Sequence, residues 1–161
     1  MIKKTLLAAS VICSISSFAI ADSYVIGAPM PSFADKWLSY LFEGVSDFDA
    51  EHDNVDIKLT DANEDPSKML NDVDNFIDAQ VSALLVVPTD VAIVKPIAKK
   101  ASRAGIPLVI VNRLPDSDTM DNVDAYVGSE SIQAGIIQAE SIVGMLDGKP
   151  GNVAILMGVL G

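Results

Sequence analysis

Two short stretches of the chain carry side chains that could hold a ring with several hydroxyl groups. Phe33, Asp35 and Trp37 place aromatic faces around a carboxylate, and Asn112 and Arg113 add an amide and a guanidinium. Planar groups engage neighbouring hydroxyls in pairs, and charged partners make the stronger hydrogen bonds. An aromatic face buries the C–H side of a sugar ring. Because one carboxylate and one guanidinium sum to zero charge, the set predicts a neutral sugar or cyclic polyol as ligand.

Each of these residues also has a purely structural interpretation. Trp37 lies at helical spacing with leucine and valine side chains, so it could pack in the core. Asp35 could stabilise the N-terminus of a helix. Asn112 could satisfy a loop, and Arg113 could form a surface ion pair in an acidic chain. The binding hypothesis depends on their shared location.

That location follows from the apolar run Pro107–Pro115, which reads Pro-Leu-Val-Ile-Val-Asn-Arg-Leu-Pro. A short run rich in β-branched residues and bounded by Gly105 and proline is typical of a buried parallel strand. Ligands of open α/β sheets bind outside the carboxyl ends of the strands. Asn112 and Arg113 occupy that position, and the loop that carries Asp35 follows another strand.

Apolar runs and helical stripes alternate along the chain, with short connections between them. This alternation predicts an α/β fold, a parallel three-layer sandwich with a Rossmann-like lobe and strand order 2-1-3-4-5. Asp65 and Pro66 predict a helix N-cap and first position, Asp90 is expected in the first turn of the third helix, and Gly105 predicts that helix's end. Strands are expected at Ser23–Gly27, Val55–Leu59 and Val81–Val87, in the apolar run from Pro107 up to Asn112, and at Ala125–Val127 and Asn152–Met157. Helices are expected at Ala34–Ala50, from Pro66, at Val91–Ala104 and at Ser131–Leu146.

The N-terminal residues 1–21 have the composition of a secretory signal peptide: two lysines, an apolar stretch and a small-x-small cleavage pattern. An uncleaved membrane anchor is the alternative, and Ile12 before Cys13 argues against a lipid anchor. Removing Lys3 and Lys4 leaves 9 basic against 22 acidic residues, a net charge of about −13. This charge argues against nucleic-acid and anionic-membrane partners. Without cysteine, the exported part must be stabilised by its core.

No enzymatic motif stands out in the sequence. His52 is the only histidine and sits in a hydrophilic helix end, so it is expected to be solvated; one histidine with scattered acids does not predict a metal site. Gly27 is the one glycine after the first strand, so a phosphate cradle is not expected there. We therefore expect no catalytic residue, no metal and no cofactor.

The sequence resembles the periplasmic sugar-binding proteins of ABC transporters, of the ribose-, galactose- and inositol-binding type. The resemblance rests on Pro31–Trp37, Ala83–Pro88, Gly105–Arg113, Tyr126–Ser129 and Gly135–Gln138. It implies that residues matching Asp35, Asn112 and Arg113 hydrogen-bond the sugar and that Trp37 stacks on its ring. It implies a periplasmic protein with two lobes joined by a hinge, which delivers its ligand to a membrane permease or reports it to a chemoreceptor.

On this resemblance, residues 22–126 form the N-terminal ligand-binding lobe, 127–130 the hinge, and 131–161 an incomplete second lobe. A truncated chain would expose Val153, Ile155 and Leu156 and would bind at best at about millimolar concentration. The residues leave open which sugar or polyol binds. The alternatives are another small ligand in chemosensing, or an inactive fragment. A repressor-type effector domain is disfavoured by the signal peptide and by the missing helix-turn-helix.

Overall fold

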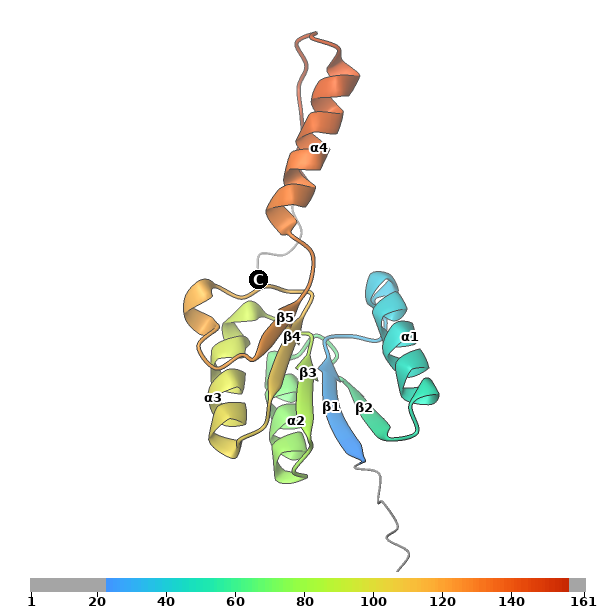
Figure 1. The fold of residues 1–161 in the computed structure, drawn as a ribbon. Coiled ribbons are helices and arrows are strands. Elements are labelled where there is room, and N and C mark those ends of the chain that lie inside the picture. Colours follow the sequence, from blue (N-terminus) through green and yellow to red (C-terminus); the bar gives the residue numbers. More distant parts are fainter. Residues whose placement is uncertain (1–22, 157–161) are drawn as a thin grey trace, which may run out of the picture.

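The computed structural model describes residues 23–156, so the predicted signal peptide lies outside the described residues. Five parallel strands form one sheet in the order β2-β1-β3-β4-β5, as predicted (Figure 1). The strands are β1 (Tyr24–Met30), β2 (Val55–Asp61), β3 (Ala83–Val86), β4 (Leu108–Val111) and β5 (Ala125–Val127). The helices are α1 (Lys36–Glu51), α2 (Pro66–Asp78), α3 (Val94–Ala104) and α4 (Ser131–Leu146), with the 3₁₀ turns η1 (Val91–Ile93) and η2 (Ser117–Thr119).

The first strand continues to Met30, beyond the end at Gly27 that the sequence suggested. Its last three residues pair with the last three residues of β2. Pro29, which has no amide hydrogen, is tolerated here because the paired register between β1 and β3 stops at Gly27 and Leu84. The Pro29 carbonyl still accepts a hydrogen bond from the Val87 amide at 3.3 Å. The loop that carries the aromatic residues is therefore shorter than expected.

The helix ends follow the predicted capping residues. Asp65 accepts a hydrogen bond from the Ser67 amide and Pro66 opens α2. Gly105 ends α3 with φ +70°, the left-handed conformation that favours glycine. The predicted third helix is divided into η1 and α3, and Asp90 caps η1 by accepting from the Ala92 amide at 2.8 Å.

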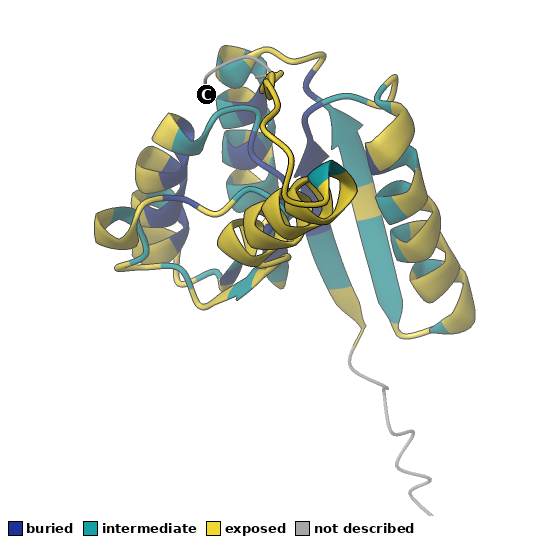
Figure 2. Cartoon of the chain, turned by 90° about the horizontal axis from the view of Figure 1, so that it is seen from above, coloured by how far each residue is buried: buried dark blue, intermediate teal, exposed yellow. Residues whose placement is uncertain are grey.

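The two faces of the sheet are covered unequally. Helices α2 and α3 pack on one face, over a fully buried cluster that includes Met69, Val73, Leu84, Ile97 and Ile110. Helix α1 packs on the other face over β1 and β2, in a smaller buried cluster of Ala28, Met30, Leu38, Val87 and Val111. Figure 2 shows the buried residues concentrated on the α2 and α3 side.

The C-terminal part of the described chain departs from the sheet. Helix α4 has the predicted bounds, but none of its residues is buried, and it projects away from the strand ends (Figures 1 and 2). The expected strand Asn152–Met157 is wrong over its described part, because residues 151–156 are irregular; Met157 lies outside the described range. A strand needs a neighbour for its backbone hydrogen bonds, and no described strand lies beside this segment. The predicted exposure of Val153, Ile155 and Leu156 is confirmed.

Within residues 23–156, every helix is too short or too polar to cross a lipid bilayer.

Candidate ligand-binding site

Asp35 lies between β1 and α1 and serves as the N-cap of the helix. Its Oδ1 accepts hydrogen bonds from the backbone amides of Trp37 at 2.7 Å and Leu38 at 3.0 Å. These bonds satisfy two donors that the first helical turn leaves free. The structural alternative considered for Asp35 is therefore present in the molecule. Neither bond uses Oδ2, so the carboxylate retains an oxygen that can accept a hydroxyl.

Trp37 points away from the core, with 62% of its surface exposed. The apolar stripe of α1 consists of Leu38, Leu41, Phe42 and Val45, of which Leu38 is fully buried. Placing Trp37 on that stripe was wrong. Leu38, the next residue, faces the sheet, and Trp37 lies about 100° around the helix axis from it. The core-packing interpretation of Trp37 is thereby excluded, and its indole remains free to contact a ligand.

Phe33 precedes the cap and is also half exposed. Its ring meets the ring of Phe42 edge to face, with centroids 5.2 Å apart and an interplanar angle of 64°. Edge-to-face packing is the arrangement that the quadrupoles of two aromatic rings favour. One part of the Phe33 ring is thus held against α1, while 46% of the residue remains exposed.

Asn112 follows β4 in a left-handed conformation, with φ +69°. Asparagine tolerates this conformation better than most residues do. Its amide donates to the Val127 carbonyl at 2.8 Å, and its carbonyl accepts from the Tyr126 hydroxyl at 2.9 Å. Both bonds use the backbone of Asn112, so β5 fixes the turn without engaging the side-chain amide.

Arg113 is partly buried and reaches from the end of β4 to the end of β3. Its Nη1 donates to the Pro88 carbonyl at 2.9 Å and also contacts the Thr89 carbonyl. The proposed surface ion pair is therefore replaced by bonds to two backbone carbonyls. A guanidinium has five N–H donors, so two such bonds from Nη1 leave others that can reach a ligand.

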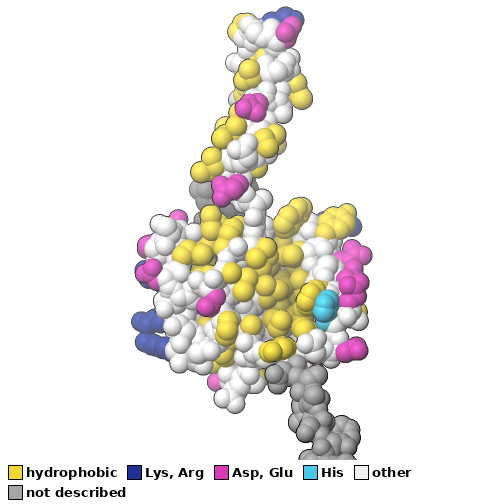
Figure 3. All heavy atoms as spheres, viewed as in Figure 1, with side chains coloured by type: hydrophobic (Ala, Val, Ile, Leu, Met, Phe, Trp, Pro, Cys, Tyr) yellow, Lys and Arg dark blue, Asp and Glu magenta, His cyan; other side chains and the backbone are white. Residues whose placement is uncertain are grey.

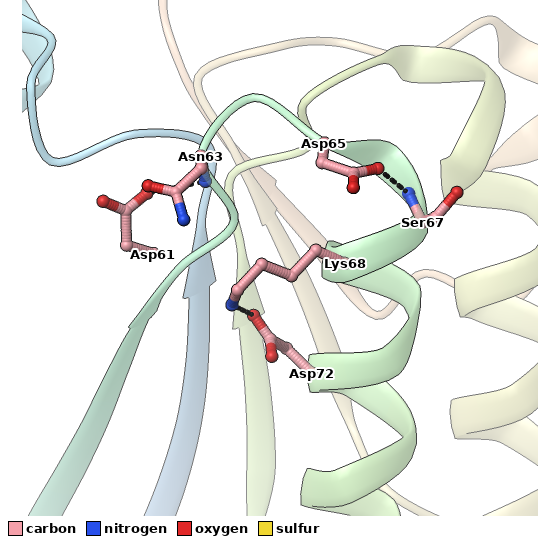
Figure 4. Close-up of polar contacts among 6 residues, drawn as sticks. All are labelled: Asp61, Asn63, Asp65, Ser67, Lys68 and Asp72. Atoms are coloured by element: carbon pink, nitrogen blue, oxygen red, sulfur yellow. Dashed lines mark hydrogen bonds and ion pairs between the residues drawn. The ribbon is translucent and has the colours of Figure 1, made fainter.

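The loop after β2 borders the same edge of the sheet. Asn63 and Glu64 both have positive φ, and the Glu64 amide donates to the Pro31 carbonyl at 2.7 Å. In Figure 4, the Asp61 carboxylate accepts from the Asn63 amide, while Lys68 pairs with Asp72 on α2 at 2.9 Å. These acids are thus engaged locally. Across the described residues, no group of three or more potential ligands is placed to hold a metal ion.

Two hydroxyl groups at the strand ends were not singled out from the sequence. Thr60 is the second-last residue of β2 and pairs with Pro29 of β1, and Thr89 follows β3. The Oγ1 atoms of both residues are buried and have no hydrogen-bond partner within the described chain. Their position next to a strand end is the sequence signal that could have found them. Pro88 and Thr89 join the candidate site through their carbonyl contacts with Arg113.

The remaining features lie away from this edge. His52 is partly exposed, and its ring stacks on Phe48 with centroids 3.9 Å apart while Nδ1 contacts the Phe48 carbonyl. It is therefore held against α1 rather than fully solvated. A hollow of about 390 Å³ lies beside Pro107 and Asp124, where β4 and β5 begin. That is the edge opposite the one where ligands of parallel sheets bind.

The fold and this edge define one lobe of a periplasmic binding protein. The solved structure of an ABC transporter solute-binding protein from Bacillus halodurans, with bound myo-inositol, matches with a TM-score of 0.74 and 32% identity over 80% of this chain. One from Actinobacillus succinogenes with bound D-allose matches with a TM-score of 0.75 and 26% identity over 86% of this chain.

The model of the periplasmic binding protein domain matches residues 26–161, and the chain belongs to this family. A protein of Rhizobium meliloti named for rhizopine binding is 37% identical over 159 residues, 98% of this chain. A ribose import binding protein of Bacillus subtilis is 30% identical over 138 residues.

The chain spans about half the length of the relatives that it matches. It covers 50% of the Rhizobium meliloti protein, 44% of the Bacillus subtilis protein, and 44% and 50% of the two solved chains. About half of each of these relatives is therefore not matched by this chain.

Proposed function

We propose that the chain forms the N-terminal recognition lobe of an exported binding protein for a monosaccharide or cyclic polyol, taken up through an ABC transporter. The observation that carries the proposal is the set of side chains at the carboxyl edge of the sheet. Asp35, Trp37 and Phe33 follow β1, and Asn112 and Arg113 follow β4. The relatives named for ribose and rhizopine, and the solved structure with myo-inositol, support this ligand class.

In this site each side chain has a separate task. The free carboxylate oxygen of Asp35 accepts from a ligand hydroxyl, and the remaining donors of Arg113 and the Asn112 amide bind neighbouring hydroxyls. Trp37, with Phe33 beside it, covers the apolar face of the ring. The relatives named for rhizopine and ribose binding support recognition as the task of the site.

The division of the chain follows from the same proposal. Residues 1–21 direct export to the periplasm, 22–126 form the ligand-binding lobe, 127–130 form the hinge, and 131–161 begin a second lobe. The permease, or a chemoreceptor, would bind the closed two-lobed form of the protein. Because this chain supplies the ligand contacts of one lobe only, we expect it to bind its ligand with a dissociation constant of about millimolar at best.

Nuclear magnetic resonance tests this site directly. Titration of the isotope-labelled chain with myo-inositol, ribose and galactose should shift the amide signals of residues 33–37 and 112–113 for at least one of them. The Trp37→Ala variant should lose the shifts, whereas Tyr40→Ala, an exposed aromatic change one turn along α1, should retain them. Shifts confined to other residues would refute the site. Micromolar binding by this chain alone would refute the expectation that the contacts of one lobe are insufficient for tight binding.

A further inference from the structure

The turn that carries Asn112 and Arg113 has an unusual backbone conformation. Asn112 has φ +69°, and the Arg113 amide donates to the Val111 carbonyl, two residues back, at 2.9 Å. This is the hydrogen bond of a γ-turn, and a γ-turn with positive φ at its centre is rare and strained. Strained residues persist where the surrounding structure fixes them, and they concentrate at ligand sites. Contacts from outside the turn must therefore hold it.

Two hydrogen bonds from β5 hold this turn. The Asn112 amide donates to the Val127 carbonyl at 2.8 Å, directly after the last paired residues of β4 and β5, Val111 and Val127. The Asn112 carbonyl accepts from the Tyr126 hydroxyl at 2.9 Å. The first bond continues the backbone pairing of the strands, whereas the second depends on a single side chain. Tyr126 is therefore the side chain whose loss would release the turn.

Packing on both faces of the sheet fixes the neighbours of the turn. The Tyr126 ring packs against the buried cluster beneath α2 and α3, and Tyr126 pairs with Ile110 of β4. Val111, the residue before the turn, belongs to the cluster on the face that carries α1. Figure 3 shows the hydrophobic side chains that continue over that face, beside α1 and below the start of α4. The Tyr126 hydroxyl and the Asn112 carbonyl are thus kept at a defined separation.

Gly128 leaves room for this hydroxyl. A Cβ at Gly128 would overlap the Tyr126 hydroxyl oxygen and the ring carbon that carries it. A side chain at residue 128 would therefore displace the tyrosine, and glycine is the residue that permits such a close approach. At Gly44 and Gly135, by comparison, a Cβ would meet no atom within 4 Å. The close contact at Gly128 is thus specific to the residue beside the Tyr126 hydroxyl.

We propose that Tyr126 is a positioning residue for the ligand site at the carboxyl edge of the sheet. Its hydroxyl holds the strained turn, and the turn determines where Asn112 and Arg113 meet the hydroxyl groups of a sugar or polyol. The Arg113 guanidinium is bonded to two carbonyls after β3, so relaxation of the turn would move Asn112 relative to it. The ligand step rests on the proposed function, whereas the role of the hydroxyl in the turn does not.

Nuclear magnetic resonance of the ligand-free chain tests the role of the hydroxyl in the turn. A positive φ brings the amide and Hα protons of Asn112 close together, which gives a strong nuclear Overhauser signal. One hydrogen bond corresponds to a factor of about 2–10 in an equilibrium, so Tyr126→Phe should lose about half of this signal. Gly128→Ala, which crowds the hydroxyl, should also weaken it. Tyr24→Phe, at a tyrosine that is 47% exposed at the start of β1, should leave it unchanged. An unchanged signal in Tyr126→Phe would overturn the proposal.

Titration of the same variants with myo-inositol, ribose and galactose tests the ligand step. For a sugar that shifts the signals of residues 33–37 and 112–113 in the native chain, Tyr126→Phe should raise the dissociation constant by about 3- to 10-fold. Tyr24→Phe should not raise it. A relaxed turn with an unchanged dissociation constant would show that Tyr126 only stabilises the fold, and would overturn the proposal. If no sugar shifts the native signals, the proposed function fails and the ligand step fails with it, whereas the Asn112 signal still decides whether Tyr126 holds the turn.

Discussion

The guanidinium of Arg113 lies 2.9 Å from the carbonyl oxygen of Pro88 and thereby joins the ends of β4 and β3. The two strands are neighbours in the sheet, and their paired register ends close by, at Val86 and Ile110. The bond from Arg113 to Pro88 therefore connects the two strands beyond their last paired residues, Val86 and Ile110. It also fixes the direction of the charge at the edge where the ligand is proposed to bind.

Replacing Arg113 by alanine should lower the free energy of unfolding by about 1–3 kcal/mol, because two carbonyls lose a charged donor. Urea denaturation measures the change. Arg103→Ala, an exposed arginine in the last turn of α3, is the matched control and should cost about 0.5 kcal/mol. Equal effects of the two substitutions would contradict a specific role of Arg113 between the strand ends.

Two substitutions of Asp35 should separate its capping role from its proposed contact with the ligand. Asp35→Ala should destabilise the chain by about 1 kcal/mol, because the Trp37 and Leu38 amides lose their acceptor. Asp35→Asn should keep most of the stability, since asparagine also caps helices well, but should weaken sugar binding because the charge is lost. Thermal unfolding and ligand titration measure the two effects. Unchanged binding by the asparagine variant would remove Asp35 from the site.

Trp37→Ala, made in a protein that contains both lobes, should weaken ligand binding by about 1–3 kcal/mol. Because the indole is 62% exposed, the free energy of unfolding should change by less than about 0.5 kcal/mol. Calorimetric titration and urea denaturation give the two numbers. Loss of the fold in this variant, together with normal binding by Arg113→Ala, would show that the site is assigned wrongly.

Gly27→Ala should be strongly destabilising although the change adds one methyl group. A Cβ at this buried position of β1 would lie 2.5 Å from the Phe76 ring on α2. Moving the ring costs about 1–3 kcal/mol in a packed core. At Gly44 of α1 no atom lies within 4 Å, so Gly44→Ala should stabilise the chain by about 0.5–1 kcal/mol. Denaturation midpoints that move in the same direction for both variants would contradict this packing.

The sequence was sufficient to predict the sheet, its strand order and most helix ends. Runs such as Leu108–Val111 and caps such as Asp65 and Gly105 are local signals, and parallel strands with short connections allow few topologies. The convergence of Asp35 and Arg113 on one edge follows from the same rule. Hydrophobic periodicity and turn chemistry are therefore enough to place these two residues at one edge of the sheet.

Tertiary structure decided how each of those residues is used. Residues 152–156 are apolar enough for a strand but have no described neighbour to pair with, so the pattern alone misled. Trp37 shares a spacing with core residues, and only the rotation of α1 on the sheet turned it outward. Arg113 found carbonyl partners 24 and 25 residues away in the chain. Such partners depend on contacts between distant segments, which no local pattern encodes.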